Sequence, residues 1–354
     1  MNFALIGCSH PHSRAHLRTL QLLPEVGSIA LWDGHLPAAE SVAAARPEKV
    51  SEVTSDLDRL LGREDIEYVL VTVPNNESPE VIARCARAGK HILAEKPLAV
   101  SAEALRPALA AVRAAGVTLG VCYQNRRHPV VADVRRLLAE RALGRPLTIE
   151  VRMVTSQVRF RDPTHWLFRK EIAGGGILSW LGCHYVDLVR YALGQEIVEV
   201  AALTGTLSGE AIEVEDAACF SFRTAEGVLG TFHAGYLLAG SVPGYSGASY
   251  DTYIAMKGTE GGLRWQPHAR PPLLQVETLS GPLGAAPERT LSYALATSEA
   301  YGGVYGEQFV RDFITAAQTG GEPPASGEDG LKVLRILDAV YRSAETGRVV
   351  AVEA

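Results

Sequence analysis

A glutamate–lysine–proline sequence directly after an apolar segment is the first candidate for chemistry. His91–Ala94 is short and β-rich, so we predict a buried strand there, and Pro97 turns the chain just beyond it. Glu95 and Lys96 would then stand at the carboxyl end of a strand, where open α/β sheets bind their ligands. A lysine placed there can meet a substrate hydroxyl as a charged donor or proton relay. The alternative is a surface lysine beside a turn.

A second candidate group follows three consecutive glycines, Gly174–Gly176, which we expect to form a movable lead-in. Ile177–Leu193 has the length of a helix, on which Trp180, His184 and Asp187 would fall at i, i+4 and i+7 and share one face. An imidazole can exchange a proton near neutral pH, and a carboxylate can orient it. An isolated histidine on a helix is more often structural, so this row alone leaves both roles open.

The elements that must position Lys96 alternate at the spacing of βαβ units. The expected strands are Phe3–Ile6, Ile29–Trp32, Tyr68–Val73, His91–Ala94 and Thr118–Tyr123. Expected helices run from Ser13 to Leu23, from an N-cap at Ser78 to a stop at Gly89, and from a cap at Ser101 to Gly116. Apolar strands covered by helices indicate a parallel, doubly wound sheet. We therefore predict a Rossmann domain over residues 1–123.

The turn after the first strand is the candidate dinucleotide site. The fingerprint G-x-G-x-x-G would place its glycines at Gly7, Ser9 and His12, so two of the three are replaced. The context is retained, because the turn joins a strand to a helix and Asp33 follows the second strand as a ribose contact. A helix N-terminus also offers N–H groups to a pyrophosphate.

The histidines of this turn raise the alternative of a metal site. His10, His12 and His16 lie close together in the sequence, but Pro11 and their mixed spacing argue against metal binding. We therefore predict no metal, and we assign His10, Pro11 and His12 to the cofactor site.

Residues 124–354 carry a different pattern, in which a predicted helix at His128–Leu138 precedes a series of β-patterned runs. These runs are Leu147–Val154, Ile197–Thr206, Ala217–Arg223, Gly227–Ala234, Tyr253–Lys257 and Leu273–Glu277. Turn signals such as Ala225–Gly227 join neighbouring runs as hairpins. We predict an α+β domain over 124–354 with a large, mainly antiparallel open sheet, whose last helix is a candidate to pack back near the first domain.

Taken together, these motifs resemble the glucose–fructose oxidoreductase / inositol dehydrogenase (Gfo/Idh/MocA) family of NAD(P)-dependent oxidoreductases. The matching segments are the Gly7 turn with His16, Val73–Asn75, Ala88–His91 with Glu95–Pro97, Tyr123–Arg126, Gly174–Gly176 with Gly182–Asp187, Lys257–Gly261, and the last helix through Ser343 to Val350. The resemblance implies hydride transfer between a nicotinamide cofactor and a secondary alcohol or ketone of a sugar, cyclitol or related polyol. It also implies assembly into a homodimer or homotetramer through the second sheet.

The resemblance assigns roles to individual residues. Lys96 and His184 are the expected catalytic pair, with Asp187 orienting the imidazole. The expected cofactor-binding residues are Gly7, Ser9, His10, Pro11, His12, Asp33, Val73, Pro74, Asn75, Glu95, Lys96 and Gln124. The expected substrate-binding residues are Asn125, Arg126, Trp166, Trp180 and His184. The alternatives are a solvated domain junction for Gln124 and Asn125 and a buried structural role for Trp166. Asp33 favours NAD over NADP, since it would repel a 2′-phosphate.

Trp180 departs from the family pattern, which has an aspartate at that position. An indole N–H is only a donor, so we expect Trp180 to pack against a sugar ring and His184 to act alone as base. Activity should then fall at low pH. The alternatives are a non-catalytic dinucleotide sensor, similar to the galactose repressor, and an NAD-dependent glycosidase.

Charge, hydropathy and cysteine content indicate which other kinds of protein the chain does not resemble. The net charge of −6 offers no general attraction to nucleic acid, and we expect no membrane span because no apolar run approaches ~20 residues. Five scattered cysteines without a C-x-x-C motif indicate reduced thiols, and hence a cytoplasmic protein. The first strand begins near Phe3, so we expect no cleaved signal segment.

Overall fold

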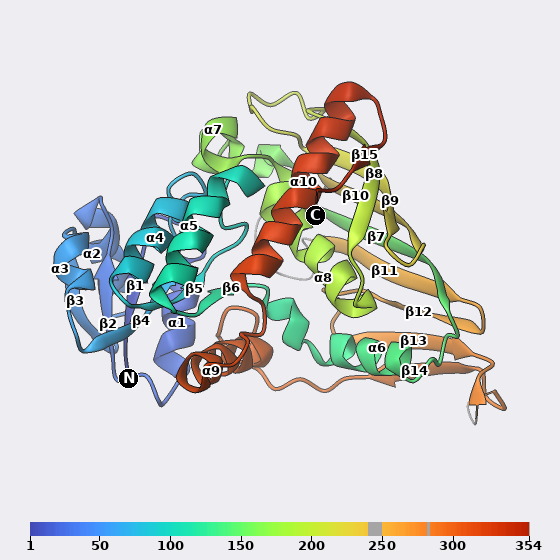
Figure 1. Ribbon diagram of the computed structural model, residues 1–354, viewed down its shortest axis with the longest axis horizontal. Helices are drawn as coiled ribbons and strands as arrows, with labels where there is room; N and C mark the ends of the chain where they lie inside the picture. Colours follow the sequence, from blue (N-terminus) through green and yellow to red (C-terminus); the bar gives the residue numbers. More distant parts are fainter. Residues whose placement is uncertain (240–249, 282–283, 354) are drawn as a thin grey trace. The chain divides into compact units, whose positions relative to one another are not determined.

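The computed structural model describes residues 1–239, 250–281 and 284–353, and it divides into two compact units (Figure 1). Unit 1 comprises Met1–Arg127 with Leu295–Lys332, and unit 2 comprises His128–Ala294 with Val333–Ala354. This division differs from the expected boundary between residues 123 and 124, because a distant segment returns to the first unit. Val121 N–H donates to the carbonyl of Ala325 at 2.9 Å, which ties that segment to the edge of a sheet.

The sheet of unit 1 runs in the strand order β3-β2-β1-β4-β5-β6, and its strand pairs are parallel. The strands are β1 Asn2–Ile6, β2 Ser28–Trp32, β3 Val50–Thr54, β4 Ile66–Val71, β5 His91–Ala94 and β6 Leu119–Val121. This is the doubly wound order, with its switch point between β1 and β4, and the predicted Rossmann sheet is confirmed. The sequence reasoning missed β3, a half-exposed edge strand with polar residues.

Unit 1 also contains helices, of which the first five connect its strands. They are α1 Ser13–Leu22, α2 Leu36–Ala45, α3 Leu57–Leu61, α4 Ser78–Arg87, α5 Ala102–Ala115, α9 Val304–Thr319 and the first residues of α10 Gly327–Thr346. The predicted caps of α5 are confirmed, since Ser101 Oγ accepts the N–H of Ala104 at 3.2 Å and Gly116 ends the helix at φ 67°. Ser78, expected as an N-cap, is instead the first residue of α4.

Unit 2 contains a mixed sheet in the order β14-β13-β12-β11-β7-β10-β9-β8-β15. The strands are β7 Pro146–Ser156, β8 Ile197–Gly205, β9 Ala217–Thr224, β10 Leu229–Leu238, β11 Tyr250–Gly258, β12 Gly261–Trp265, β13 Leu273–Thr278, β14 Glu288–Ser292 and β15 Val350–Ala351. β10 pairs in parallel with β7 and the other pairs are antiparallel, so the predicted mainly antiparallel sheet is confirmed. On β9, buried Ala218, Phe220 and Phe222 alternate with exposed residues, which gives the sheet one apolar face.

The helices of unit 2 include the segment that carries the predicted catalytic histidine. They are α6 Pro129–Ala139, α7 Lys170–Ala173, α8 Cys183–Leu193 and the remainder of α10. The expected continuous α-helix over Ile177–Leu193 is wrong, because Leu178–Gly182 forms a π-helical turn before α8. A π turn closes i→i+5 hydrogen bonds, so the α-helical spacing between Trp180 and His184 does not hold there.

Within the described residues, one helical stretch has the length and hydropathy of a membrane span. It covers Lys170–Leu193, with a mean hydropathy of 1.2, and 89% of its apolar window is buried within the protein. That burial is typical of a core helix.

Candidate functional site

The turn after β1 is held against the end of β2 by a carboxylate. Asp33 Oδ2 accepts the N–H groups of Cys8 at 2.7 Å and Ser9 at 2.8 Å, and the Ser9 hydroxyl at 2.9 Å. Gly7 has φ 103°, and a Cβ there would lie 2.5 Å from the carbonyl oxygen of Thr72. Only glycine fits this position, because the backbone approaches β4 too closely for a side chain.

Asp33 retains the capacity to bind a ribose. Its Oδ1 accepts the N–H of His35 at 2.8 Å, and a carboxylate has about four lone-pair sites, so Oδ1 can accept a ribose hydroxyl as well. The side chain lies at the carboxyl end of β2, and α1 begins at Ser13 just after the turn. These residues therefore fit a dinucleotide despite the two missing glycines.

A second carboxylate, Glu95, organises a buried group that we call the Glu95 cluster: Glu95, Lys96, His12, His16 and Tyr301. Glu95 Oε1 lies 3.0 Å from His12 Nδ1 and 2.5 Å from His16 Nε2. Lys96 Nζ lies 4.0 Å from Glu95 Oε2, and its side chain is fully buried. The Tyr301 hydroxyl lies 3.1 Å from His12 Nδ1, and its ring packs 4.7 Å from both imidazoles.

The charges of this cluster follow from its burial and its hydrogen bonds. Burial alone would raise the pKa of Glu95, but the charges and hydrogen bonds of His12, His16 and Lys96 outweigh it and hold that pKa well below its usual range. Burial lowers the pKa of His12 to about 4, against the opposing pull of Glu95. At neutral pH, Glu95 is therefore an anion and His12 a neutral donor to it. The buried Lys96 side chain thus lies beside a fixed anion.

His12 and Tyr301 show what the sequence reasoning could not find. His12 stands at the third glycine position of the fingerprint, and its side chain fills the space against Glu95. Tyr301 comes from the segment that returns to unit 1, where its N–H donates to Thr19 Oγ1 at 2.8 Å. Its only local signal was the following Gly302–Gly303, which indicates a turn and says nothing of its spatial neighbours.

His16, Glu95 and Cys122 are close enough to suggest a metal site, since their ligand atoms lie within 4.8 Å of one another. Burial raises the pKa of the Cys122 thiol well above its usual value, so it stays protonated, and only a thiolate is a good ligand. A cation would also face the ammonium of Lys96. The chemistry of this group favours hydrogen bonding over metal binding.

The other predicted residues of unit 1 differ in their burial. Val73, Asn75, His10 and Gln124 are buried, Pro74 and Asn125 are half-buried, and Ser9 and Pro11 are exposed. The guanidinium of Arg126 contacts both carboxylate oxygens of Asp329 at 3.1 Å and donates to the carbonyl of Pro324 at 3.1 Å. These contacts favour a structural role for Arg126, and substrate binding by it stays a prediction.

In unit 2, Trp180 lies on the π turn, His184 and Asp187 lie on α8, and Trp166 begins a short 3₁₀ helix, Trp166–Phe168. Trp180 is 3% exposed and packs edge-to-face on Trp166, with ring centroids 6.4 Å apart. His184 and Asp187 are buried, and Asp187 Oδ1 lies 3.8 Å from Arg190 Nη1. The convergence of His184 with Lys96, the orienting role of Asp187 and the substrate contact of Trp180 all stay predictions.

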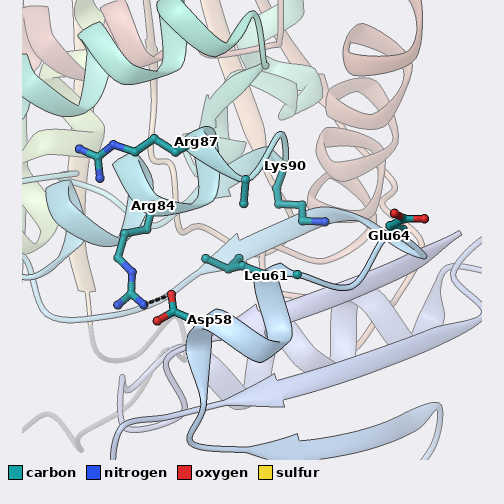
Figure 2. A pocket seen from close by; sticks show the side chains of 8 residues that line it. Asp58, Leu61, Glu64, Arg84, Arg87 and Lys90 are labelled. Atoms are coloured by element: carbon teal, nitrogen blue, oxygen red, sulfur yellow. Dashed lines mark hydrogen bonds and ion pairs between the residues drawn. The ribbon is translucent and has the colours of Figure 1, made fainter.

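A surface pocket of unit 1 lies away from these residues (Figure 2). Its lining comprises Asp58, Leu61, Gly62, Glu64, Arg84, Arg87, Ala88 and Lys90. Arg84 pairs with Asp58 at 2.5 Å, and Lys90 Nζ donates to the carbonyls of Arg63 at 2.7 Å and Ile66 at 2.8 Å. These cations already serve the packing of α3 and α4, so we assign the pocket no ligand.

Comparison with known proteins agrees with this arrangement. A family model described as an oxidoreductase family with an NAD-binding Rossmann fold matches residues 1–123, and a GFO/IDH/MocA C-terminal domain model matches residues 131–264. Inositol 2-dehydrogenase of Rhizobium meliloti is 28% identical over 99% of both chains. Levoglucosan dehydrogenase of Pseudarthrobacter phenanthrenivorans is 28% identical over 87% of this chain and 88% of its own.

A solved structure extends the similarity to the fold. Levoglucosan dehydrogenase in complex with NADH and levoglucosan superposes with a TM-score of 0.87 at 27% identity, covering 100% of each chain. The two-unit fold of this chain is thus a known architecture. The chain belongs to the GFO/IDH/MocA family of NAD-binding oxidoreductases.

Proposed function

We propose that this protein is an NAD-dependent dehydrogenase or reductase that acts on a secondary alcohol, or the matching ketone, of a sugar, cyclitol or related polyol. The observation that carries the proposal is the ionised, buried Glu95 beside Lys96 at the carboxyl end of β5. A buried anion–ammonium pair is costly to maintain, and such pairs concentrate at catalytic sites. The names of the relatives, dehydrogenases of inositol and of levoglucosan, support the substrate class.

In this reaction, each candidate site residue has its own role. The nicotinamide ring, when bound, supplies the hydride chemistry. Lys96 holds and polarises the reacting oxygen, and His184 accepts the proton released when an alcohol is oxidised. Asp33 accepts a ribose hydroxyl, and its charge disfavours a 2′-phosphate, so NAD is preferred over NADP. Trp180 offers an aromatic plane to the ring of the substrate.

The test is the absorbance of the reduced nicotinamide, followed with NAD and in parallel with NADP over a panel of sugars and cyclitols. We expect net reduction of NAD with at least one polyol and slower turnover with NADP. Trp180, which replaces the usual aspartate, favours the competing function of a non-catalytic sensor. Tight NADH binding without turnover on any polyol would establish that sensor, and hydrolysis that needs NAD without net absorbance change would establish a glycosidase.

We also propose a cytoplasmic homodimer or homotetramer that assembles through the sheet of unit 2. Leu203 on β8 is 69% exposed and Leu229 on β10 is 50% exposed, and large apolar side chains of this kind are suited to a subunit interface. The cysteines that the structure describes are free thiols, which supports a reducing compartment. Light scattering of the purified protein measures the assembly state.

A further inference from the structure

A buried carboxylate accepts hydrogen bonds from the start of the helical segment that carries His184. Glu215 lies in the loop before β9 and is 8% exposed. Its Oε2 accepts the N–H of Gly176 at 2.7 Å, and its Oε1 accepts the N–H of Leu178 at 3.0 Å and the Tyr341 hydroxyl at 3.0 Å. We call these four residues the Glu215 clamp. Its members come from three separate parts of unit 2.

The glycines of this segment are explained by close approach to the clamp. A Cβ at Gly176 would lie 1.9 Å from the backbone oxygen of Glu215, which also accepts the N–H of Ile177 at 3.2 Å. A Cβ at Gly175 would lie 1.9 Å from the hydroxyl oxygen of Tyr341. The expected movable lead-in is thus packed on both sides, and glycine is needed there for space.

The Glu215 clamp supplies acceptors for the backbone N–H groups at a buried helix start. The first N–H groups of a helix have no partner within it, and burying them unpaired is unfavourable. Here one side chain and its own backbone oxygen accept three successive donors, from Gly176, Ile177 and Leu178. The π turn that follows begins at Leu178, so its starting direction is set by these bonds.

We propose that Glu215 and Tyr341 are positioning residues that fix the π turn and thereby the placement of His184. The inference rests on the proposed function, since it takes His184 as the group that exchanges a proton with the substrate. Tyr341 acts through Glu215 by donating to Oε1, and Ser179 Oγ lies 3.2 Å from the Tyr341 hydroxyl at the same end of the helix.

The first test is Glu215→Gln in the full-length protein. Glutamine keeps one acceptor oxygen but turns an NH₂ group, a donor, toward the remaining donors of the clamp. We expect kcat on the polyol found in the substrate panel to fall on the order of 10²-fold, as small misplacements of catalytic groups do, while the Kd for NADH stays unchanged. Glu213→Gln is the matched control, because Glu213 is exposed and lies two residues earlier. It should leave both values unchanged.

A second test of Glu215→Gln needs no substrate. Hydrogen exchange followed by mass spectrometry should show faster exchange in the peptide 174–184 of Glu215→Gln and no change in that peptide of Glu213→Gln. Tyr341→Phe removes one donor and keeps the packing, so it should lower kcat by a smaller factor. The double variant should match Glu215→Gln alone, because both residues act through one carboxylate.

Three outcomes would overturn the inference: wild-type kcat in Glu215→Gln, exchange at 174–184 unchanged in that variant, or a double variant whose loss is the product of the single losses. If Glu215→Gln does not fold, wild-type kcat in Tyr341→Phe overturns it instead. A wild-type protein that turns over no polyol would refute the proposed function, so the two failures are distinguishable.

Discussion

Two buried glutamates, Glu95 of unit 1 and Glu215 of unit 2, have pKa values that are shifted in opposite directions. Glu95 is 5% exposed and directly precedes Lys96, and Glu215 is 8% exposed and accepts hydrogen bonds at the start of the helical segment that carries His184. The pKa of Glu95 is held well below its usual range, whereas burial raises the pKa of Glu215. Similar burial therefore does not decide the direction in which the pKa of a carboxyl group shifts in this protein.

The partners account for the difference. Glu95 faces the imidazoles of His12 and His16 and the ammonium of Lys96, and these stabilise its charge more than burial opposes it. Glu215 receives backbone N–H groups and the hydroxyl of Tyr341, which only partly offset its burial. Glu95 lies beside charged and titratable side chains. Glu215 accepts hydrogen bonds from uncharged donors at the start of the helical segment that carries His184.

The largest expected effect comes from removing the cation beside Glu95. Lys96→Met should lower kcat by ~10²–10⁴-fold, the usual loss for a positioned acid/base group, and His184→Ala should do the same. Turnover of the panel substrate measures both, and NADH binding reports whether the nucleotide site is intact. Near-wild-type kcat in both variants would show that neither cluster serves catalysis.

A direct comparison replaces each glutamate by glutamine and measures the free energy of unfolding in urea. Glu95→Gln leaves Lys96 buried without its anion, and breaking a buried pair costs about 3–5 kcal/mol. Glu215→Gln loses one acceptor among neutral donors, for which about 1–3 kcal/mol is expected. Equal losses, or a larger loss at Glu215, would contradict the pairing of Glu95 with a buried cation.

His12 and Glu215 should change the free energy of unfolding in opposite directions as the pH falls. The pKa of His12 is about 4 in the folded protein and about 6.5 in an unfolded chain, so its contribution to stability is lost as the pH falls from 6.5 to 4. The raised pKa of Glu215 acts in the opposite direction, because the folded state then binds a proton that the unfolded state has released. Each group changes the free energy of unfolding by at most about 1.4 kcal/mol per pH unit.

Single variants separate the contributions of His12 and Glu215 to the pH dependence of the free energy of unfolding. Between pH 6.5 and 5, His12→Asn should lose stability less steeply on acidification than the wild type. Glu215→Gln should lose it more steeply, because the opposing contribution of Glu215 is gone. Urea unfolding across this range measures both, and parallel curves for all three proteins would refute the linkage. Glu95 adds a further loss only below about pH 4.5, since its folded pKa is depressed.

The sequence by itself determined the parallel sheet of unit 1 and the place of Lys96 in it. Short apolar runs, the cap at Ser101 and the stop at Gly116 are local signals, and they were read correctly because adjacent residues decide them. Pro97 after β5 likewise placed Glu95 at a strand end. The edge strand β3 was missed since it has too few buried residues to produce a pattern.

Only the tertiary structure decided which residues surround the two glutamates. His12 and Glu95 are 83 residues apart, Tyr301 and His12 are 289 apart, and Tyr341 and Glu215 are 126 apart. The topology brings such pairs together by joining strand ends and returning distant helices, and no local pattern records those meetings. The π turn is of the same kind, because its direction depends on a carboxylate from another loop. Composition and spacing therefore predicted the elements, and long-range packing set the charges and directions of the side chains that they carry.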